Sequence, residues 1–252
     1  MLNNPTSDKL LELKLQGMAN AFKQQQEMPE VAKLTFDERF GLLVDAEYND
    51  REKTRLGQRL KAAKLRQSAC VEDIDLQQHR GLDRRMLTQL ATCSWIREGL
   101  NLLITGKTGV GKSYLACALA QKACRQGFSS LYLRAPRFFQ ELTVARLNGG
   151  YTRYLAKLEK FQLLILDDFA LVPISEEQCR DLLEVTDDRC GKSSIILASQ
   201  LPVKEWYQTF ENATLADAIL DRVVHGSYRL ELEGESRRKN KGKKSTDSEP
   251  NQ

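Results

Sequence analysis

The segment Gly106–Ser113 constrains the fold of this chain more than any other feature of the sequence. It reads Gly-Lys-Thr-Gly-Val-Gly-Lys-Ser and matches the P-loop pattern G-x-x-x-x-G-K-[ST] at every defined position. An apolar run at 100–105 precedes it and predicts a buried strand. A run rich in Ala and Leu at 114–124 follows it and predicts a helix. Strand, glycine-rich loop and helix are the context that this motif requires, so an α/β fold with a phosphate-binding loop is predicted.

The residue types of this loop explain the chemistry that we expect. Glycines let the backbone turn successive N–H groups inward, and the following helix directs its positive dipole end to the same point. We expect Lys112 to reach the β and γ phosphates and the Ser113 hydroxyl to ligate Mg²⁺, which makes ATP and Mg²⁺ the expected cofactors. The predicted nucleotide-binding residues are Gly106, Lys107, Thr108, Gly109, Val110, Gly111, Lys112, Ser113 and Tyr114.

A second motif supplies acidic groups to the same site. The apolar run Leu163–Leu166 ends in Asp167 and Asp168, a Walker B pattern in which a buried strand delivers carboxylates to the ligand-binding edge of a sheet. We expect Asp167 to contact Mg²⁺ through water, and Asp168 to orient or deprotonate an attacking water.

Two further polar residues follow predicted elements. Gln200 comes after the apolar run 195–199, where a polar side chain can hydrogen-bond the γ-phosphate or the water, although such a residue is also ordinary at a strand end. Arg222 ends the helical stretch 215–224 and can serve a neighbouring subunit as an arginine finger, or form a surface ion pair.

Five apolar segments alternate with helical stretches in the second half of the chain. The predicted strands are 100–105, 129–135, 161–167, 193–199 and 227–233. Near-continuous apolar strands between helices are typical of a parallel sheet covered on both faces. The fifth strand alternates polar and apolar residues, so we expect it at an edge. Residues 8–66 read as helical with a break at Met28-Pro29.

These patterns predict a domain organisation. A helical N-terminal domain for DNA or partner binding covers 1–70, a linker with a short helix covers 71–99, the α/β ATPase domain covers 100–236, and a basic disordered tail covers 237–252.

Composition excludes several classes of protein. No apolar run approaches the roughly 20 residues that a membrane helix needs, and the N-terminal residues lack an export signal, so a cytoplasmic location without membrane contact is expected. The six cysteines form no C-x-x-C pair and only two histidines are present, which argues against a zinc site or a disulfide framework.

Basic residues concentrate in two places although the net charge is only +4. Residues 51–66 contain seven Lys or Arg and one Glu, and residues 237–244 contain six Lys or Arg and no acid. Such patches predict an anionic partner other than the nucleotide. On a helix continuing through residue 66, the arginines fall within an arc of about 80° beside an apolar stripe. This ridge predicts contact with the phosphates of double-stranded DNA, and a solvated charged face is the alternative; its members are Arg51, Arg55, Arg59 and Arg66.

The order of the motifs resembles a known family. The P-loop is followed by Leu-Asp-Asp at 166–168, Ala-Ser-Gln-Leu-Pro at 198–202, Leu-Asp-Arg at 220–222 and Gly-Glu-Ser-Arg-Arg at 234–238. Over about residues 5–240 this set resembles the IstB-like AAA+ ATPases, transposition helpers encoded by insertion sequences beside their transposase, and the related DnaC-type helicase loaders. The resemblance implies an AAA+ fold, with Gln200 as sensor 1, Arg222 as arginine finger and Arg238 as a sensor 2-like residue.

The resemblance also implies a function. An IstB-like chain is expected to form ATP-dependent oligomers on duplex DNA and to assist the transposase of the same transposable element in DNA recombination. Three alternatives stay open at this point: a DnaC-type helicase loader, a small-molecule P-loop kinase, and a nucleotide-gated DNA scaffold without significant turnover.

Overall fold

The computed structural model describes residues 5–74 and 81–234 and divides the chain into two compact units. We call residues 1–58 the N-terminal unit and residues 59–252 the C-terminal unit. The boundary falls inside one helix, α3 (Phe36–Ala63). Arg238 and the predicted tail 237–252 lie outside the described residues. No helix in the described ranges is both long and apolar enough to cross a bilayer.

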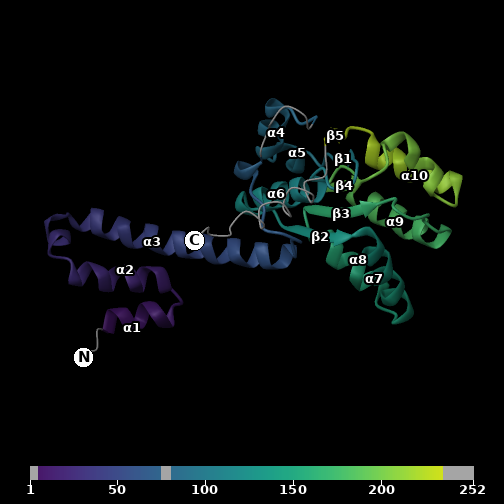
Figure 1. Ribbon diagram of the computed structural model, residues 1–252. Helices are drawn as coiled ribbons and strands as arrows, with labels where there is room; N and C mark the ends of the chain where they lie inside the picture. The colour runs from purple at the N-terminus through teal and green to yellow at the C-terminus, as the bar shows by residue number, and fades with distance from the viewer. Residues whose placement is uncertain (1–4, 75–80, 235–252) are drawn as a thin grey trace, which may run out of the picture. The chain divides into compact units, whose positions relative to one another are not determined.

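The N-terminal unit is helical, as its sequence predicts. It contains α1 (Pro5–Glu12), α2 (Gln16–Glu27), the 3₁₀ helix η1 (Pro29–Lys33) and the start of α3 (Figure 1). Thr35 and Glu38 cap α3 reciprocally, because the Thr35 N–H donates to Glu38 at 2.8 Å and the Glu38 N–H donates to the Thr35 hydroxyl at 3.4 Å.

Helices α2 and α3 approach closely at one glycine. A Cβ added at Gly17 would lie 2.6 Å from the carbonyl oxygen of Ala46, so only glycine fits without a shift. The Glu47 carboxylate accepts the Met18 N–H at 3.1 Å and thereby satisfies a donor in the first turn of α2.

The C-terminal unit contains a five-stranded parallel sheet, which confirms the predicted α/β fold. The strands are β1 (Leu102–Gly106), β2 (Ser130–Arg134), β3 (Leu163–Phe169), β4 (Ser194–Ser199) and β5 (Tyr228–Leu232). Their order is β2-β3-β4-β1-β5, and each neighbouring pair is parallel. Strand β5 pairs only with β1 within this sheet and lies at an edge, as its alternating sequence predicts.

Both faces of the sheet are buried beneath helices (Figure 1). Alternate residues of β1 show this, since Leu102 and Ile104 belong to one apolar cluster and Leu103 to another. The first cluster includes α4 (Arg84–Ala91), α5 (Ser94–Arg97) and α6 (Lys112–Arg125). The second includes α7 (Ala135–Leu147), α8 (Tyr151–Glu159), α9 (Glu176–Arg189), the 3₁₀ helix η3 (Val203–Thr209) and α10 (Ala213–Val224).

The segment that the sequence suggested as a linker contributes to the first cluster. It contains the 3₁₀ helix η2 (Val71–Asp73) as well as α4 and α5. Leu90 and Trp95 are fully buried, and the Trp95 indole N–H donates to the Leu90 carbonyl at 3.0 Å. Residues 84–97 are therefore part of the core of the C-terminal unit rather than a connection between domains.

Candidate functional site

The P-loop connects the end of β1 to the start of α6, as the sequence predicts. Gly111 precedes the first residue of α6 with a φ of +107°, a backbone conformation that favours glycine. Gly106 has a φ of +143°, and a Cβ there would lie 2.2 Å from the carbonyl oxygen of Leu232 in β5. The edge strand thus passes so close to the loop that a side chain at Gly106 has no room.

Lys112 turns its ammonium group back over this loop. Its Nζ donates to the carbonyl oxygens of Gly106 at 2.7 Å and Lys107 at 2.9 Å, and the residue is buried. The lysine ammonium therefore lies at the same loop that is expected to bind a polyphosphate.

A cavity of about 610 Å³ opens beside the loop, a size typical of small-ligand sites. It brings together predicted site residues from separate elements. Its lining includes Thr108, Gly109, Val110, Gly111, Lys112, Ser113, Tyr114, Asp168 and Gln200 from the prediction, together with Arg66, Gln67, Asp73, Ile74, Leu82, Leu115, Arg134, Leu171 and Leu232.

The two acids at the end of β3 point to different partners. Asp167 is buried; its Oδ2 accepts the Tyr132 hydroxyl at 2.5 Å and its Oδ1 accepts the Asp168 N–H at 2.9 Å. Asp168 has a φ of +57°, and its Oδ2 accepts from Nε of Arg134 at 2.8 Å. The register between β3 and β4 shifts between Leu166 and Phe169, the stretch that contains both acids. Burial and the bond to Asp167 raise the pKa of the Tyr132 phenol.

Gln200 reaches the P-loop from the end of β4. Its Oε1 accepts the Thr108 hydroxyl at 2.7 Å. This contact joins the strand end to the loop, and both residues line the cavity.

Arg66 also lies in this site, contrary to its predicted place on a helical ridge. Helix α3 ends at Ala63 and Lys64 has a φ of +50°, so the chain leaves the helix before Arg66. Nη1 of Arg66 lies 3.7 Å from Oδ2 of Asp167, and the hydrogen bond with Tyr132 raises the pKa of its guanidinium. The premise of a continuous helix through residue 66 is wrong.

Comparison with known proteins identifies the family. A model described as IstB-like ATP binding protein matches residues 8–245. The chain belongs to this family. It is 48% identical over 245 residues to the "Putative insertion sequence ATP-binding protein y4pL" of Sinorhizobium fredii, covering 97% of this chain and 100% of that protein. It is 49% identical over 203 residues to the "Insertion sequence IS1162 putative ATP-binding protein" of Pseudomonas fluorescens, covering 80% and 88% of the two chains.

Solved structures support the AAA+ fold of this IstB-like chain. The crystal structure of DnaI matches with a TM-score of 0.56 at 23% identity, over 67% of this chain and 92% of that one. The crystal structure of the DnaC helicase loader matches with a TM-score of 0.55 at 16% identity, over 66% and 97%. At these identities the likeness shows the fold alone.

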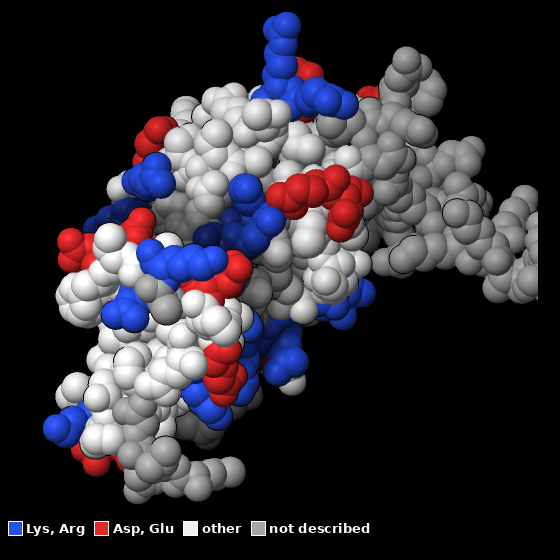
Figure 2. Space-filling view, turned by 90° about the vertical axis from the view of Figure 1, so that its left-hand side faces the viewer, with Lys and Arg blue, Asp and Glu red and all other residues white. Residues whose placement is uncertain are grey.

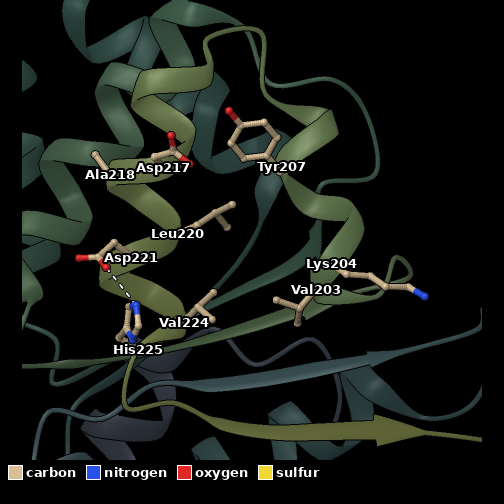
Figure 3. A pocket seen from close by; sticks show the side chains of 9 residues that line it. All are labelled: Val203, Lys204, Tyr207, Asp217, Ala218, Leu220, Asp221, Val224 and His225. Atoms are coloured by element: carbon tan, nitrogen blue, oxygen red, sulfur yellow. Dashed lines mark ion pairs between the residues drawn. The ribbon is translucent and has the colours of Figure 1, made fainter.

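Arg222 of the IstB-like chain lies outside the lining of the nucleotide cavity. Its Nε donates to Asp187 at 2.7 Å and its Nη1 to the Ala218 carbonyl at 2.8 Å. A separate hollow lies beside α10, the helix that carries Arg222. It is lined by residues of α10 and η3 and by His225, which forms an ion pair with Asp221 (Figure 3). Within one chain Arg222 is held in an ion pair, and a role toward a neighbouring subunit stays a prediction.

The remaining arginines of the predicted ridge differ in their surroundings. Arg51 donates to Glu47 and Arg55 to Glu52, each at 2.7 Å, and both arginines are exposed. Arg59 is half-buried. On the face drawn in Figure 2, Lys and Arg lie among Asp and Glu side chains. Contact with DNA through these residues stays a prediction.

Sequence reasoning missed two residues of the site, Tyr132 and Arg134. Both belong to β2, and the register of β2 on β3 places Arg134 opposite Asp167. A signal was present, since a polar residue ends a predicted strand at the same sheet edge, but the strand order was needed to connect it with the acids.

The donor set fits a nucleotide-bound magnesium ion. Ser113 in the first turn of α6 and Asp168 line the cavity, and the buried Asp167 directly precedes Asp168 in β3. In the ranges 5–74 and 81–234, no group of three or more His, Cys, Asp or Glu could hold a metal by itself. Mg²⁺ commonly takes one or two protein oxygens and completes its shell with water and phosphate, which suits this sparse set.

Proposed function

We propose that this IstB-like protein is a Mg²⁺-dependent ATPase that assembles on double-stranded DNA and assists the transposase of an insertion sequence. The observation that carries the proposal is the cavity at which the P-loop lysine, Asp168 of β3 and Gln200 meet. The names of its relatives, which describe ATP-binding proteins of insertion sequences, support the biological setting.

The polar residues of the P-loop and of the ends of β3 and β4 have separate roles in this reaction. Ser113 and Asp167 would hold Mg²⁺, which would neutralise phosphate charge. The Lys112 ammonium binds the β and γ phosphates in exchange for its carbonyl partners. Asp168 orients the attacking water, and Arg134 fixes the direction of its carboxylate. Gln200 contacts the γ-phosphate or the water from the end of β4.

Arg222 acts on the site of a neighbouring subunit in this proposal. To do so it exchanges the Asp187 carboxylate for a phosphate. The exchange costs little because Asp187 is well exposed and such surface ion pairs contribute at most about 1 kcal/mol. ATP bound between subunits therefore favours self-association. Arg238 is retained as a sensor 2-like residue from the resemblance, although it lies outside the described residues.

The DNA contact is assigned to the exposed arginines of α3. Arg51 and Arg55 are one helical turn apart and can each exchange a glutamate partner for a DNA phosphate. Such contacts bind the backbone, so the affinity falls steeply with salt and depends weakly on sequence. Arg59 has a smaller exposed surface and Arg66 belongs to the cavity, so neither is needed for this assignment.

Electron microscopy of the purified protein with duplex DNA tests the proposal. Assemblies on DNA are expected with Mg-ATP and not without nucleotide. Lys112→Ala abolishes them, whereas Arg137→Gln, which removes a surface arginine paired with Glu141, leaves them intact. Equal assembly by Lys112→Ala would contradict nucleotide control. Asp168→Asn distinguishes an ATPase from a nucleotide-gated scaffold. The variant is expected to abolish ATP hydrolysis, so loss of support for transposition would indicate an ATPase and retention would indicate a scaffold.

A helicase loader is the second candidate, and the shared fold with DnaI and DnaC favours it. Affinity purification from cells that contain the insertion sequence distinguishes the two. Recovery of the transposase supports the first proposal, and recovery of the replicative helicase in its place supports the second.

A further inference from the structure

Arg66 is placed in the cavity by the segment that follows α3. Within the C-terminal unit, Ala69 is buried in the apolar cluster beneath α6, and Leu65 and Val71 pack against the same cluster. Anchors on both sides of Arg66 hold its backbone against the nucleotide domain. Its position at the cavity is therefore a property of the folded unit rather than of a free chain end.

The guanidinium of Arg66 balances a buried negative charge. Asp167 is 1% exposed, and a carboxylate so far from water requires partners for both oxygens. Oδ1 has the Asp168 N–H, whereas Oδ2 has the Tyr132 hydroxyl and, at 3.7 Å, Nη1 of Arg66. Arg66 brings a full positive charge to this oxygen.

The same carboxylate is the one that would hold a metal with Ser113. Arg66 and Ser113 line one cavity, so a cation attached to Asp167 enters the field of the Arg66 charge. Two cations that share one carboxylate repel each other, and only one of them can be its close partner.

We propose that Arg66 is the resident counter-ion of Asp167 in the nucleotide-free site and that Mg-nucleotide binding displaces it. Arg66 thereby sets the magnesium concentration at which the site is filled. Only the displacement rests on the proposed function, because the pairing with Asp167 is a contact between two residues of this chain. It assigns Arg66 as a positioning residue of the site in place of a DNA contact.

A double-mutant cycle without nucleotide or magnesium tests the pairing. Unfolding is measured for the full chain carrying Arg66→Gln, Asp167→Asn or both changes. Arg66→Gln is expected to lower the unfolding temperature of the wild-type background and to have little effect beside Asp167→Asn, because the charge that it balances is then gone. Equal losses in both backgrounds would overturn the pairing. Arg137→Gln, whose partner is Glu141, is the control and should show no coupling to Asp167.

A magnesium titration tests the displacement. Binding of a fluorescent ATP analogue is followed as Mg²⁺ is added to wild type, Arg66→Gln and Arg66→Lys. Arg66→Gln removes the guanidinium charge that repels Mg²⁺ at a separation of some ångströms in a solvated site. The half-saturating Mg²⁺ concentration is therefore expected to fall by about threefold to tenfold. Arg66→Lys keeps the charge and should stay near wild type.

The two experiments decide separately on the pairing of Arg66 with Asp167 and on its displacement by Mg-nucleotide. An unchanged or higher half-saturating concentration in Arg66→Gln overturns the displacement. Absence of nucleotide binding by the wild type overturns the proposed function and the displacement together, while the ligand-free cycle still decides the pairing of Arg66 with Asp167.

Discussion

The two units of the chain differ in how they are held together. The C-terminal unit encloses large side chains completely, among them Trp95, Trp206 and Phe138. In the described part of the N-terminal unit, by contrast, the buried residues are small or charged, and aromatic residues such as Phe36 (70% exposed) and Tyr48 (65% exposed) face outward. The C-terminal unit is therefore stabilised by an apolar core, and the N-terminal unit by a few specific contacts.

This difference indicates where the chain tolerates change. An apolar core distributes its free energy over many contacts, whereas α2 and α3 depend on the close approach at Gly17 and on the Glu47 carboxylate. A unit of fewer than 60 residues buries a small fraction of its surface and is marginal without such contacts. Substitutions of the same kind should therefore have different effects in the two units.

The largest contrast is expected from one substitution made in both units. Phe138→Ala removes a fully buried ring and should lower the free energy of unfolding by about 3–5 kcal/mol. Phe36→Ala removes an exposed ring stacked on Phe40 and should cost at most about 1 kcal/mol. Chemical denaturation of the full chain measures both, with tryptophan fluorescence from Trp95 and Trp206 reporting the C-terminal unit and far-UV circular dichroism reporting the helices of the N-terminal unit. Similar losses for the two variants would refute the contrast.

A methyl group added at the P-loop should have the next largest effect. Gly106→Ala places a Cβ 2.2 Å from the Leu232 carbonyl oxygen and should cost about 3 kcal/mol through overpacking and backbone strain. In a unit of this size, that corresponds to a fall in unfolding temperature of roughly 6–12 °C. Gly127→Ala is the control, because it shares a positive φ but meets nothing within 4 Å, so the difference isolates the collision with β5. Equal losses for both variants would remove β5 from the explanation.

The sequence predicts well the parts of the site that are local in the chain. The P-loop lies between β1 and α6 as expected, because its strand, glycines and helix are contiguous. The acids at the end of β3 are predictable for the same reason, because the apolar run of the buried strand ends directly before them. The edge position of β5 followed from its alternating residues.

The parts that depend on distant contacts were not predictable. The sequence predicts Arg66 on a helix because no proline or glycine marks the end of α3, which ends where Lys64 takes a left-handed conformation. The sequence predicts a linker with a short helix at α4 and α5, because their core contacts are with α6 and the sheet, which are distant in the chain. Arg134 becomes a partner of Asp168 only when β2 lies beside β3.

A smaller effect is expected from the glycine of the N-terminal unit. Gly17→Ala brings a Cβ to 2.6 Å from the Ala46 carbonyl oxygen, so the contact between α2 and α3 should lose about 1–2 kcal/mol while nucleotide affinity stays unchanged. Gly41→Ala, also in this unit but with nothing within 4 Å, should stabilise α3 by about 0.5–1 kcal/mol. Hydrogen exchange of the amides in α2 compares the variants. Equal protection in both would mean that the close approach does not hold the unit.

The smallest effect concerns the one buried acid of the described N-terminal unit, Glu47. Its hydrogen bond from Arg51 lowers the pKa of the Glu47 carboxyl below 4.5, and the Met18 N–H adds to this. Because the folded pKa lies below the unfolded value, the contribution is complete above pH 4.5 and is lost as the pH falls through the folded pKa. It should amount to about 1 kcal/mol or less, the usual net value of such hydrogen bonds.

An NMR titration of the Met18 amide measures this loss directly, because that N–H donates to the Glu47 carboxylate. Glu47→Gln should flatten the acid transition of the amide, whereas Glu27→Gln, at the exposed end of α2, should leave it in place. Helicity below pH 4.5 should retain some pH dependence in Glu47→Gln, because bonds from Thr35 also lower the pKa of Glu38. A full transition at Met18 in Glu47→Gln would show that another group holds α2 against α3, and the contrast between a unit held by a core and a unit held by single contacts would then lose its main support.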